Sequence, residues 1–225
     1  MQILHFGNED SKTVLIQMVY EHDLRVLDSE IRLIQELSGT SDFHLIAVKV
    51  DSWNDDLSPW EAPAVFGDEG FGGKSEKTFQ YVTSEVLEPL KERFGEELRF
   101  IIGGYSLSGL FALWSAYQTD VFSGCVAASP SVWFPGFTEY VAGHDISTER
   151  VYLSLGKKEE KTRNPVMSQV GNAIRAIYDQ LQSDVEVTLE WNEGNHFKEP
   201  DLRLAKGFAW CLTPLQKCYE NVTGI

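Results

Sequence analysis

The residues best placed to do chemistry lie at positions 100–110, where an apolar run leads through a glycine-flanked serine into an apolar helical pattern. Ser106 follows Gly104 by two residues, and the spacing departs from G-x-S-x-G only at Ser108, with Gly109 directly behind it. A serine at a sharp turn between a strand and a helix presents its hydroxyl to a base on one side and a substrate carbonyl on the other. The pattern predicts that Ser106 is a nucleophile, and the alternative is an ordinary strand-to-helix turn.

An acid and a base follow Ser106 in the chain, each just after a predicted strand. Glu159 comes after the strand predicted at 151–156, and His196 comes after the strand predicted at 185–191. Serine, acid and histidine in this order are typical of α/β-hydrolases, in which the three side chains meet above the sheet. We expect His196 to take the proton of Ser106, and Glu159 to orient the imidazole and stabilise its cation. Each residue alone has a simpler interpretation as a solvated loop residue, and it is their joint placement that favours catalysis.

Acyl transfer also needs two backbone N–H groups directed at the oxygen that becomes negative. Leu107, the residue after the nucleophile, is expected to supply one of them. The loop after the first predicted strand, residues 20–22, is expected to supply the other, and within it we choose Glu21.

The elements that must position these groups alternate between strands and helices. Apolar runs of strand length occupy residues 14–19, 43–50, 98–103, 124–128, 151–156 and 185–191. Their alternation with helical patterns predicts an α/β fold, with a compact, mostly parallel sheet of about six strands flanked by helices, in a single domain over residues 1–225. The irregular and aromatic-rich segment 51–74 is expected to form one wall of a pocket.

Composition limits the partners of the protein. Its 225 residues carry a net charge of −15, which argues against nucleic acid and anionic membranes, because phosphate attracts a surface that can neutralise it. The chain shows no targeting leader and no apolar run of membrane-spanning length, so we expect a cytoplasmic protein that does not enter a membrane. Cys125, Cys211 and Cys218 are odd in number and lack metal-ligand spacing, which favours a reducing compartment and no metal site. The composition is compatible with a homo-oligomer.

Three stretches carry a resemblance to a known family. They are residues 104–110 (GYSLSGL), residues 55–60 (DDLSPW), which are similar to an Asp-Leu-Thr-Pro segment, and residues 129–133 (SPSVW), which are similar to a Ser-Pro-Ser-x-Trp loop. Together with Gly156, Glu159 and His196, they resemble the putative esterase family of α/β-hydrolases. This family includes the enterochelin esterases, S-formylglutathione hydrolase (esterase D) and the mycolyltransferases.

The resemblance implies an ester hydrolase that acts on a small-molecule ester, needs no metal or organic cofactor, and has no large lid. It implies a triad of Ser106, Glu159 and His196. It also implies acyl or alcohol pockets near Trp60 and Trp133, and we add Tyr105, beside the serine, as a substrate contact.

The identity of the acid is the least constrained of these assignments. Glu160 is adjacent to Glu159 and chemically identical. Glu159 is preferred because it lies three residues beyond Gly156, at the spacing seen after this strand in the resembling family. If neither glutamate served, Glu193 would be the next candidate.

The leading interpretation is a serine carboxylesterase that forms an acyl-enzyme. An acyltransferase on the same scaffold would differ in admitting an alcohol acceptor and excluding water. A catalytically inactive module that binds a ligand in the aromatic pocket is the third interpretation, and the presence of all three triad residue types argues against it.

Overall fold

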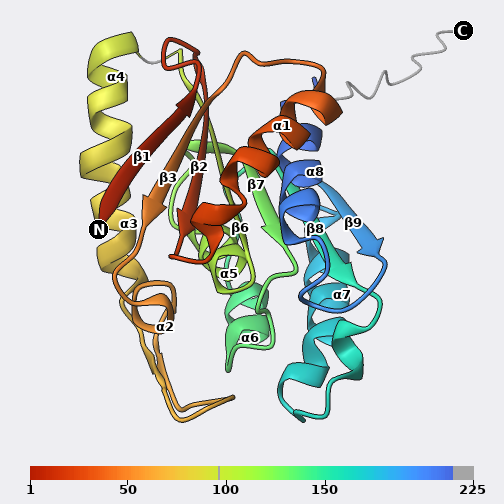
Figure 1. Cartoon of the computed structure of the whole chain (residues 1–225). Coiled ribbons are helices and arrows are strands. Elements are labelled where there is room, and N and C mark those ends of the chain that lie inside the picture. The colour runs from red at the N-terminus through yellow and green to blue at the C-terminus, as the bar shows by residue number, and fades with distance from the viewer. Residues whose placement is uncertain (96, 215–225) are drawn as a thin grey trace, which may run out of the picture.

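A seven-stranded sheet organises residues 1–95 and 97–214, the part of the chain that this computed structural model describes (Figure 1). The strands lie in the order β1-β3-β2-β6-β7-β8-β9. Their bounds are Gln2–Gly7 (β1), Thr13–Val19 (β2), His44–Lys49 (β3), Arg99–Tyr105 (β6), Phe122–Ala128 (β7), Arg150–Gly156 (β8) and Glu186–Asn192 (β9). From β3 to β9 all neighbours pair in parallel, so the carboxyl ends of these six strands share one edge of the sheet. The prediction of a mostly parallel α/β sheet is confirmed.

The seventh strand, β1, was not expected from the sequence. It pairs antiparallel with β3, from Gln2 opposite Lys49 to Gly7 opposite His44. Its residues are mostly half-buried or exposed, because an edge strand has a neighbour on one side only. A strand at the edge of the sheet needs no continuous apolar run, so the search for apolar runs in the sequence did not identify β1.

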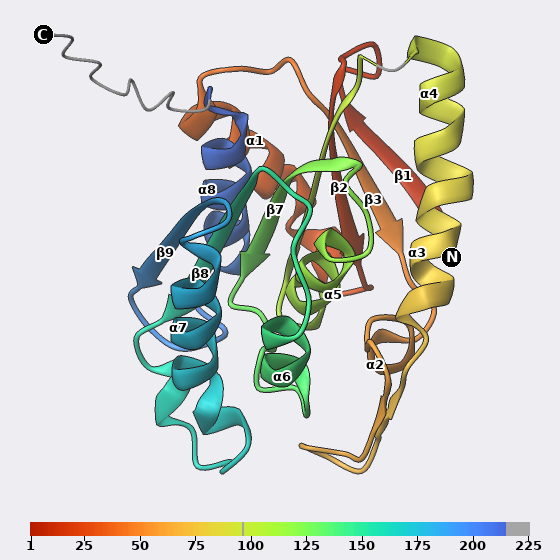
Figure 2. The same ribbon diagram turned by 180° about the vertical axis from the view of Figure 1, so that it is seen from behind.

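Helices cover both faces of the sheet (Figure 2). One face carries α1 (Leu27–Ser38) and α8 (Pro200–Leu212), which pack against each other. The other face carries α3 (Ser75–Val82), α4 (Glu88–Phe94), α5 (Leu107–Ala116) and α7 (Val170–Leu181). The short helices α2 (Trp53–Asp56) and α6 (Phe137–Ala142) and the hairpin of β4 (Glu61–Ala62) and β5 (Phe71–Gly72) lie beyond the carboxyl ends of the strands (Figure 1).

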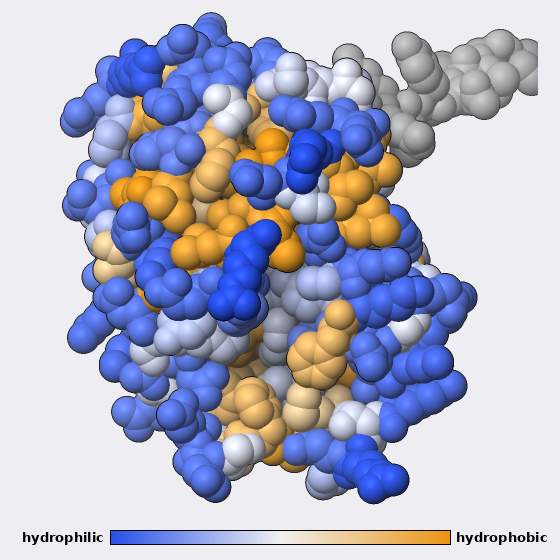
Figure 3. Space-filling model, viewed as in Figure 1, coloured by the Kyte–Doolittle hydropathy of each residue, from blue (hydrophilic) through white to orange (hydrophobic). Residues whose placement is uncertain are grey.

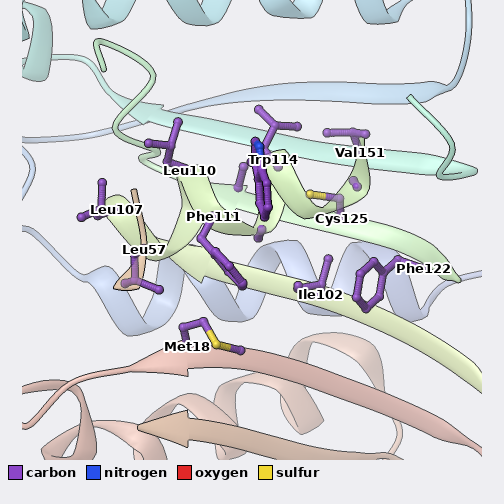
Figure 4. Packing of buried hydrophobic residues seen from close by; sticks show 14 of the residues in the cluster. Met18, Leu57, Ile102, Leu107, Leu110, Phe111, Trp114, Phe122, Cys125 and Val151 are labelled. Atoms are coloured by element: carbon purple, nitrogen blue, oxygen red, sulfur yellow. The ribbon is translucent and has the colours of Figure 1, made fainter. Parts of the chain in front are cut away.

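Helix α5 is the most deeply buried helix, since all ten of its residues are buried. Figure 4 shows Leu110, Phe111 and Trp114 among side chains from the strands, including Ile102 of β6 and Cys125 of β7. The helix follows β6 directly, so the packing that fixes α5 also fixes the turn between them.

Two remaining expectations concern the membrane and the cysteines. Within residues 1–95 and 97–214, no helix combines the length and apolar character needed to cross a membrane. Cys125 and Cys211 are buried free thiols, and Cys218 lies outside the described residues.

A buried carboxyl lies between the sheet and helix α1. Glu30 is 3% exposed, and its Oε1 is buried without a hydrogen-bonding partner among the described residues. Burial raises the pKa of Glu30 to about 8, and the nearby carboxylates of Asp23 and Asp201 add to the rise. The folded protein therefore holds a proton over a pH range in which the unfolded chain releases it.

We expect this carboxyl to make the protein less stable as the pH rises. The stabilisation is complete below the usual glutamate pKa of 4.5 and is lost as the pH climbs toward about 8, because only the native state is then protonated. Relative to Glu30→Gln, the unfolding free energy of the natural protein should fall by up to about 1.4 kcal/mol per pH unit in this window. Urea denaturation at several pH values measures this, with Glu36→Gln on the exposed face of α1 as control. Parallel curves for Glu30→Gln and the natural protein would contradict the expectation.

Candidate active site

The turn between β6 and α5 places Ser106 in a backbone conformation that few residues adopt, with φ 60° and ψ −121°. Its N–H donates to the Ala128 carbonyl at 3.1 Å, and its carbonyl accepts from the Ser131 N–H at 3.0 Å. A Cβ on Gly104 would overlap the Ser108 backbone, so this turn requires glycine there. The geometry is that of a nucleophile elbow.

Serine is accommodated at position 108 because Gly104 has no side chain, which leaves room for the Ser108 hydroxyl beside it. The Ser108 hydroxyl is buried and donates to the Met18 carbonyl of β2 at 2.8 Å. A second close approach falls on Gly109, where a Cβ would lie 2.9 Å from the Gly104 carbonyl oxygen.

Three side chains from three strand ends form a continuous chain of contacts. The Ser106 Oγ lies 3.0 Å from His196 Nε2, and His196 Nδ1 lies 2.7 Å from Glu159 Oε2. With its proton on Nδ1, the imidazole can accept the serine proton at Nε2 while the carboxylate holds the ring in place. The arrangement can therefore convert the Ser106 hydroxyl into a nucleophile.

The second oxygen of Glu159 is fully engaged elsewhere. Oε1 accepts the Gly156 N–H at 2.7 Å, the Ser129 hydroxyl at 2.8 Å and the Arg203 guanidinium at 2.9 Å. Burial alone would raise the pKa of this carboxyl, but the hydrogen bonds that it accepts, led by that from His196, lower the pKa below its usual value. Glu159 is thus a charged group whose free oxygen faces the imidazole.

The two other glutamates considered from the sequence pair with different partners. Glu160 faces Arg175, with an oxygen–nitrogen distance of 3.0 Å, and Glu193 pairs with Lys157 at the surface. The structure brings only Glu159 of these three to His196.

The sequence analysis missed Arg203, which holds the acid and the histidine loop together. Its side chain is 1% exposed, and Nη2 donates to the carbonyls of Glu193 at 3.0 Å and Asn195 at 2.9 Å. Nη1 binds Glu159, and also lies 3.3 Å from the Tyr105 hydroxyl, which itself donates to the His196 carbonyl at 2.6 Å. The sequence offers one sign of its role: Arg203 is spaced at intervals of four residues from Gly207 and Cys211, which places this arginine on the buried face of the helix.

Backbone strain gathers around this network. Among the described residues, positive φ values outside glycine occur at Ser106, Ser129 and Glu199. Ser129 binds the acid, and Glu199 lies three residues beyond the histidine. Each such conformation costs about 1–3 kcal/mol and persists only where the surroundings impose it, which is typical of functional sites.

A cavity of about 470 Å³ opens over Ser106 and His196. Much of its lining is aromatic and comes from Trp53, Phe66, Phe71, Tyr105, Trp133 and Phe197. The segment 51–74 supplies three of these rings, so it forms one wall of the cavity. Figure 3 shows pale and orange residues around a hollow in the lower half of the molecule, where the strands end.

Two of the three predicted substrate contacts, Tyr105 and Trp133, line the cavity, but Trp60 does not. The Trp60 indole N–H donates to the Pro135 carbonyl at 2.9 Å, and its ring packs against Phe134 and Phe137. Trp60 fills the interior behind the wall, and we leave it out of the pocket.

The predicted oxyanion groups come from two segments, the start of α5 and the turn after β2. Leu107 begins α5 and lines the cavity. In the turn after β2, the Tyr20 N–H donates to the Asp23 carboxylate and the Asp23 N–H donates to the Tyr20 carbonyl, so these two amides are occupied. The Glu21 side chain pairs with Lys49, whereas His22 lines the cavity. The amides of Glu21 and His22 remain as candidates.

Residues 39–190 match the family described as putative esterase. No curated protein matches the chain.

Solved structures of three hydrolases resemble this one. An IroE-like serine hydrolase from Shewanella oneidensis has a TM-score of 0.73 at 16% identity, over 92% of this chain and 74% of that chain. The siderophore hydrolase EstA from Aspergillus nidulans has a TM-score of 0.66 at 18% identity, over 92% and 85%. The enterobactin esterase FES from Shigella flexneri has a TM-score of 0.66 at 13% identity, over 95% and 56%. These similarities confirm the α/β-hydrolase fold, and no large lid lies over the cavity in residues 1–95 and 97–214.

The contacts of Glu159 predict that its replacement by an amide is far more damaging than that of its neighbour. Glu159→Gln should slow the labelling of Ser106 by a fluorophosphonate by about 10³- to 10⁴-fold, because the imidazole is then held in the wrong tautomer. Glu160→Gln, which alters only a surface ion pair, should react like the natural protein. The labelling rate of each variant measures this, and equal rates in the two would remove Glu159 from the network.

The contacts of Arg203 predict a positioning role. Arg203→Lys keeps the positive charge but cannot reach acceptors on both loops, so labelling of Ser106 should slow by about 10- to 100-fold. The low-field proton resonance of the hydrogen bond between His196 and Glu159 should weaken as well, which a general loss of stability would not cause. Arg175→Lys, at an exposed arginine, is the matched control. An unchanged resonance and labelling rate in Arg203→Lys would refute the role.

Proposed function

The chain belongs to the putative esterase family, and from this premise we propose that it is a serine hydrolase that cleaves carboxylic ester bonds through an acyl-enzyme. Ser106 is the nucleophile, His196 the general base and acid, and Glu159 the group that orients the imidazole. The observation that carries the proposal is the contact chain of 3.0 and 2.7 Å that joins these three side chains beneath an aromatic cavity.

The reaction follows from the positions of these atoms. His196 Nε2 takes the proton as Ser106 Oγ attacks the ester carbonyl, and the negative oxygen meets the N–H of Leu107 and an amide of the turn after β2. His196 then gives its proton to the departing alcohol, which leaves the acyl group on Ser106. A water molecule, activated by the same imidazole, releases the acid and restores the serine.

The buried Glu159 carboxylate stabilises the His196 cation that forms during this cycle. When His196 carries the extra proton, it is a cation 2.7 Å from Glu159 Oε2. The attraction is strong because the Glu159 side chain is only 5% exposed and so is poorly screened by water. Donors fixed on Oε1 keep the carboxylate in place throughout, which spares the reaction a reorganisation.

The substrate is defined here by the ester bond that is cleaved. The similar structures are named for siderophore hydrolysis and enterobactin ester cleavage, and at 13–18% identity they indicate ester chemistry more than a particular ester. An acyltransferase would use the same residues with an alcohol in place of water. A catalytically inactive binding module is disfavoured, because it would have no need of an aligned serine, histidine and carboxylate.

We expect the purified protein to hydrolyse p-nitrophenyl acetate, since the cavity is open to small esters. Ser106→Ala should lower turnover by about 10³-fold or more, as loss of a triad nucleophile does in other enzymes. Ser108→Gly should retain activity, because the Ser108 hydroxyl is directed at the Met18 carbonyl. Spectrophotometric assays measure both, and peptide mapping after fluorophosphonate labelling identifies the modified serine.

Two results would redirect this assignment. Modification of Ser108, or normal turnover in Ser106→Ala, would refute Ser106 as the nucleophile. If added glycerol captures most of the acyl group as a new ester, the protein is an acyltransferase.

A further inference from the structure

Exposed apolar side chains gather at the mouth of the cavity. Among residues 1–95 and 97–214, the exposed large apolar side chains are Leu37, Phe66, Val166 and Phe197. Phe66 and Phe197 line the cavity, and Val166 directly precedes Met167, which also lines it. Phe197 is the most exposed of the four, at 86%. Single exposed apolar residues need no explanation, but a cluster at a binding site does.

Phe66, Val166 and Phe197 form a rim, and specific hydrogen bonds join the segments that carry the first two. Asn164 Nδ2 donates to the Val65 carbonyl at 2.6 Å, and Asn164 Oδ1 accepts the N–H groups of Val166 at 3.0 Å and Met167 at 3.1 Å. One side chain thus ties the loop between β4 and β5, which carries Phe66, to the segment that carries Val166. These two segments are 99 residues apart at this bond, so Asn164 fixes the Phe66 side of the rim to the Val166 side.

An apolar surface continues from the rim to the nucleophile. The Phe66 ring packs edge-to-face on Trp133, with centroids 6.0 Å apart, and Ser131 in the same loop places its Oγ 3.4 Å from Ser106 Oγ. From the other direction, the Phe197 ring lies 5.5 Å from the His196 ring. A group bound to the carbonyl under attack therefore meets an apolar surface on its way out of the cavity.

The negative charge of the protein favours some substrates of this site over others. Asp23 also lines the cavity, and the protein carries a net charge of −15. A negatively charged substrate would be repelled by both, whereas an uncharged one would not.

We propose that the rim is an extension of the substrate site, and that it binds the apolar part of an uncharged ester that reaches from Ser106 to the mouth of the cavity. This inference rests on the proposed function, because the rim acts on the molecule that Ser106 attacks. The substrate class is an ester with a large apolar acyl or alcohol group and no negative charge.

The test compares esters that share a leaving group. The ratio of kcat/KM for p-nitrophenyl hexanoate to that for p-nitrophenyl acetate should be well above one in the natural protein. Phe197→Ala and Phe66→Ala should each lower this ratio by about tenfold, because each removes apolar surface that only the longer chain reaches. Leu37→Ala removes an apolar side chain that is as exposed as Phe66, at 48%, but lines a different pocket together with Trp210, and it should leave the ratio unchanged.

A second series varies the alcohol with the acyl group held as acetate, by comparing 1-naphthyl acetate with methyl acetate. If the rim binds the alcohol group and not the acyl group, Phe197→Ala and Phe66→Ala should lower the ratio of kcat/KM for 1-naphthyl acetate to that for methyl acetate. Ratios unaffected by Phe197→Ala and Phe66→Ala in both series would overturn the proposal. A preference for hexanoate that appears only above its aggregation concentration would also overturn it, since the rim would then dock on a lipid-like surface.

Charge is tested with the p-nitrophenyl monoester of adipic acid, which has the chain length of the hexanoate and ends in a carboxylate. We expect its kcat/KM to be at least about tenfold lower than that of the hexanoate, with the difference shrinking as salt screens the repulsion. Equal rates for the two esters would refute the preference for uncharged substrates.

Binding to the rim can be measured without catalysis, which separates this inference from the proposed function. The p-nitrophenyl hexyl ether cannot be hydrolysed, and its nitrophenyl ring quenches the fluorescence of tryptophans such as Trp53 and Trp133 in the cavity. It should bind Ser106→Ala about tenfold more tightly than it binds the double variant Ser106→Ala/Phe197→Ala. Failure to hydrolyse any ester would refute the proposed function alone, whereas equal binding to the two variants would refute the rim.

Discussion

The buried ion pair between Glu159 and Arg203 is the constraint on which the rest of the site depends. Its oxygen and nitrogen lie 2.9 Å apart, and the side chains are 5% and 1% exposed. Removing two charges from water costs several kcal/mol per ion, and only good geometry with further hydrogen bonds offsets the cost. The Gly156 amide, the Ser129 hydroxyl and two loop carbonyls supply those bonds. The loops must therefore stay where they are, because displacing either one would leave a buried charge without partners.

This ion pair also explains how side chains from segments that are far apart in the sequence come together in one site. Glu159 follows β8, His196 follows β9, and Arg203 comes from α8, which packs on the opposite face of the sheet from α5 and its serine. The strained backbone of Ser129 is stabilised by the same network, since its hydroxyl binds both Glu159 and Arg203. Strain of this kind is maintained by packing elsewhere in the protein, and here the packing of α8 provides it.

The sequence predicted the parts of the site that follow from local patterns. Ser106 lies where a strand becomes a helix, and Glu159 and His196 each follow an apolar strand, so the common edge of a parallel sheet brings them together. Arg203 could not be predicted in the same way, because its partners are up to 98 residues away and no local spacing relates them. Trp60 and Trp133 lie in equally aromatic stretches, and only the path of the chain decides that one is interior packing and the other lines the cavity.

Under the proposed function, the residues that would act on the ester bond are positioned separately from those that would meet the rest of the substrate. The former stand at the ends of β6, β8 and β9, where sheet pairing fixes their relative positions. The latter come largely from the hairpin of β4 and β5 and from the loop that carries Val166, which pair with each other through Asn164 and not with the main sheet. Changes in the hairpin can therefore reshape the cavity wall without moving the nucleophile, as is common when loops carry specificity on a rigid scaffold. The serine, histidine and carboxylate are held by buried contacts, whereas the rim consists of exposed side chains on loops. The proposed chemistry is therefore more tightly constrained by the fold than the choice of ester.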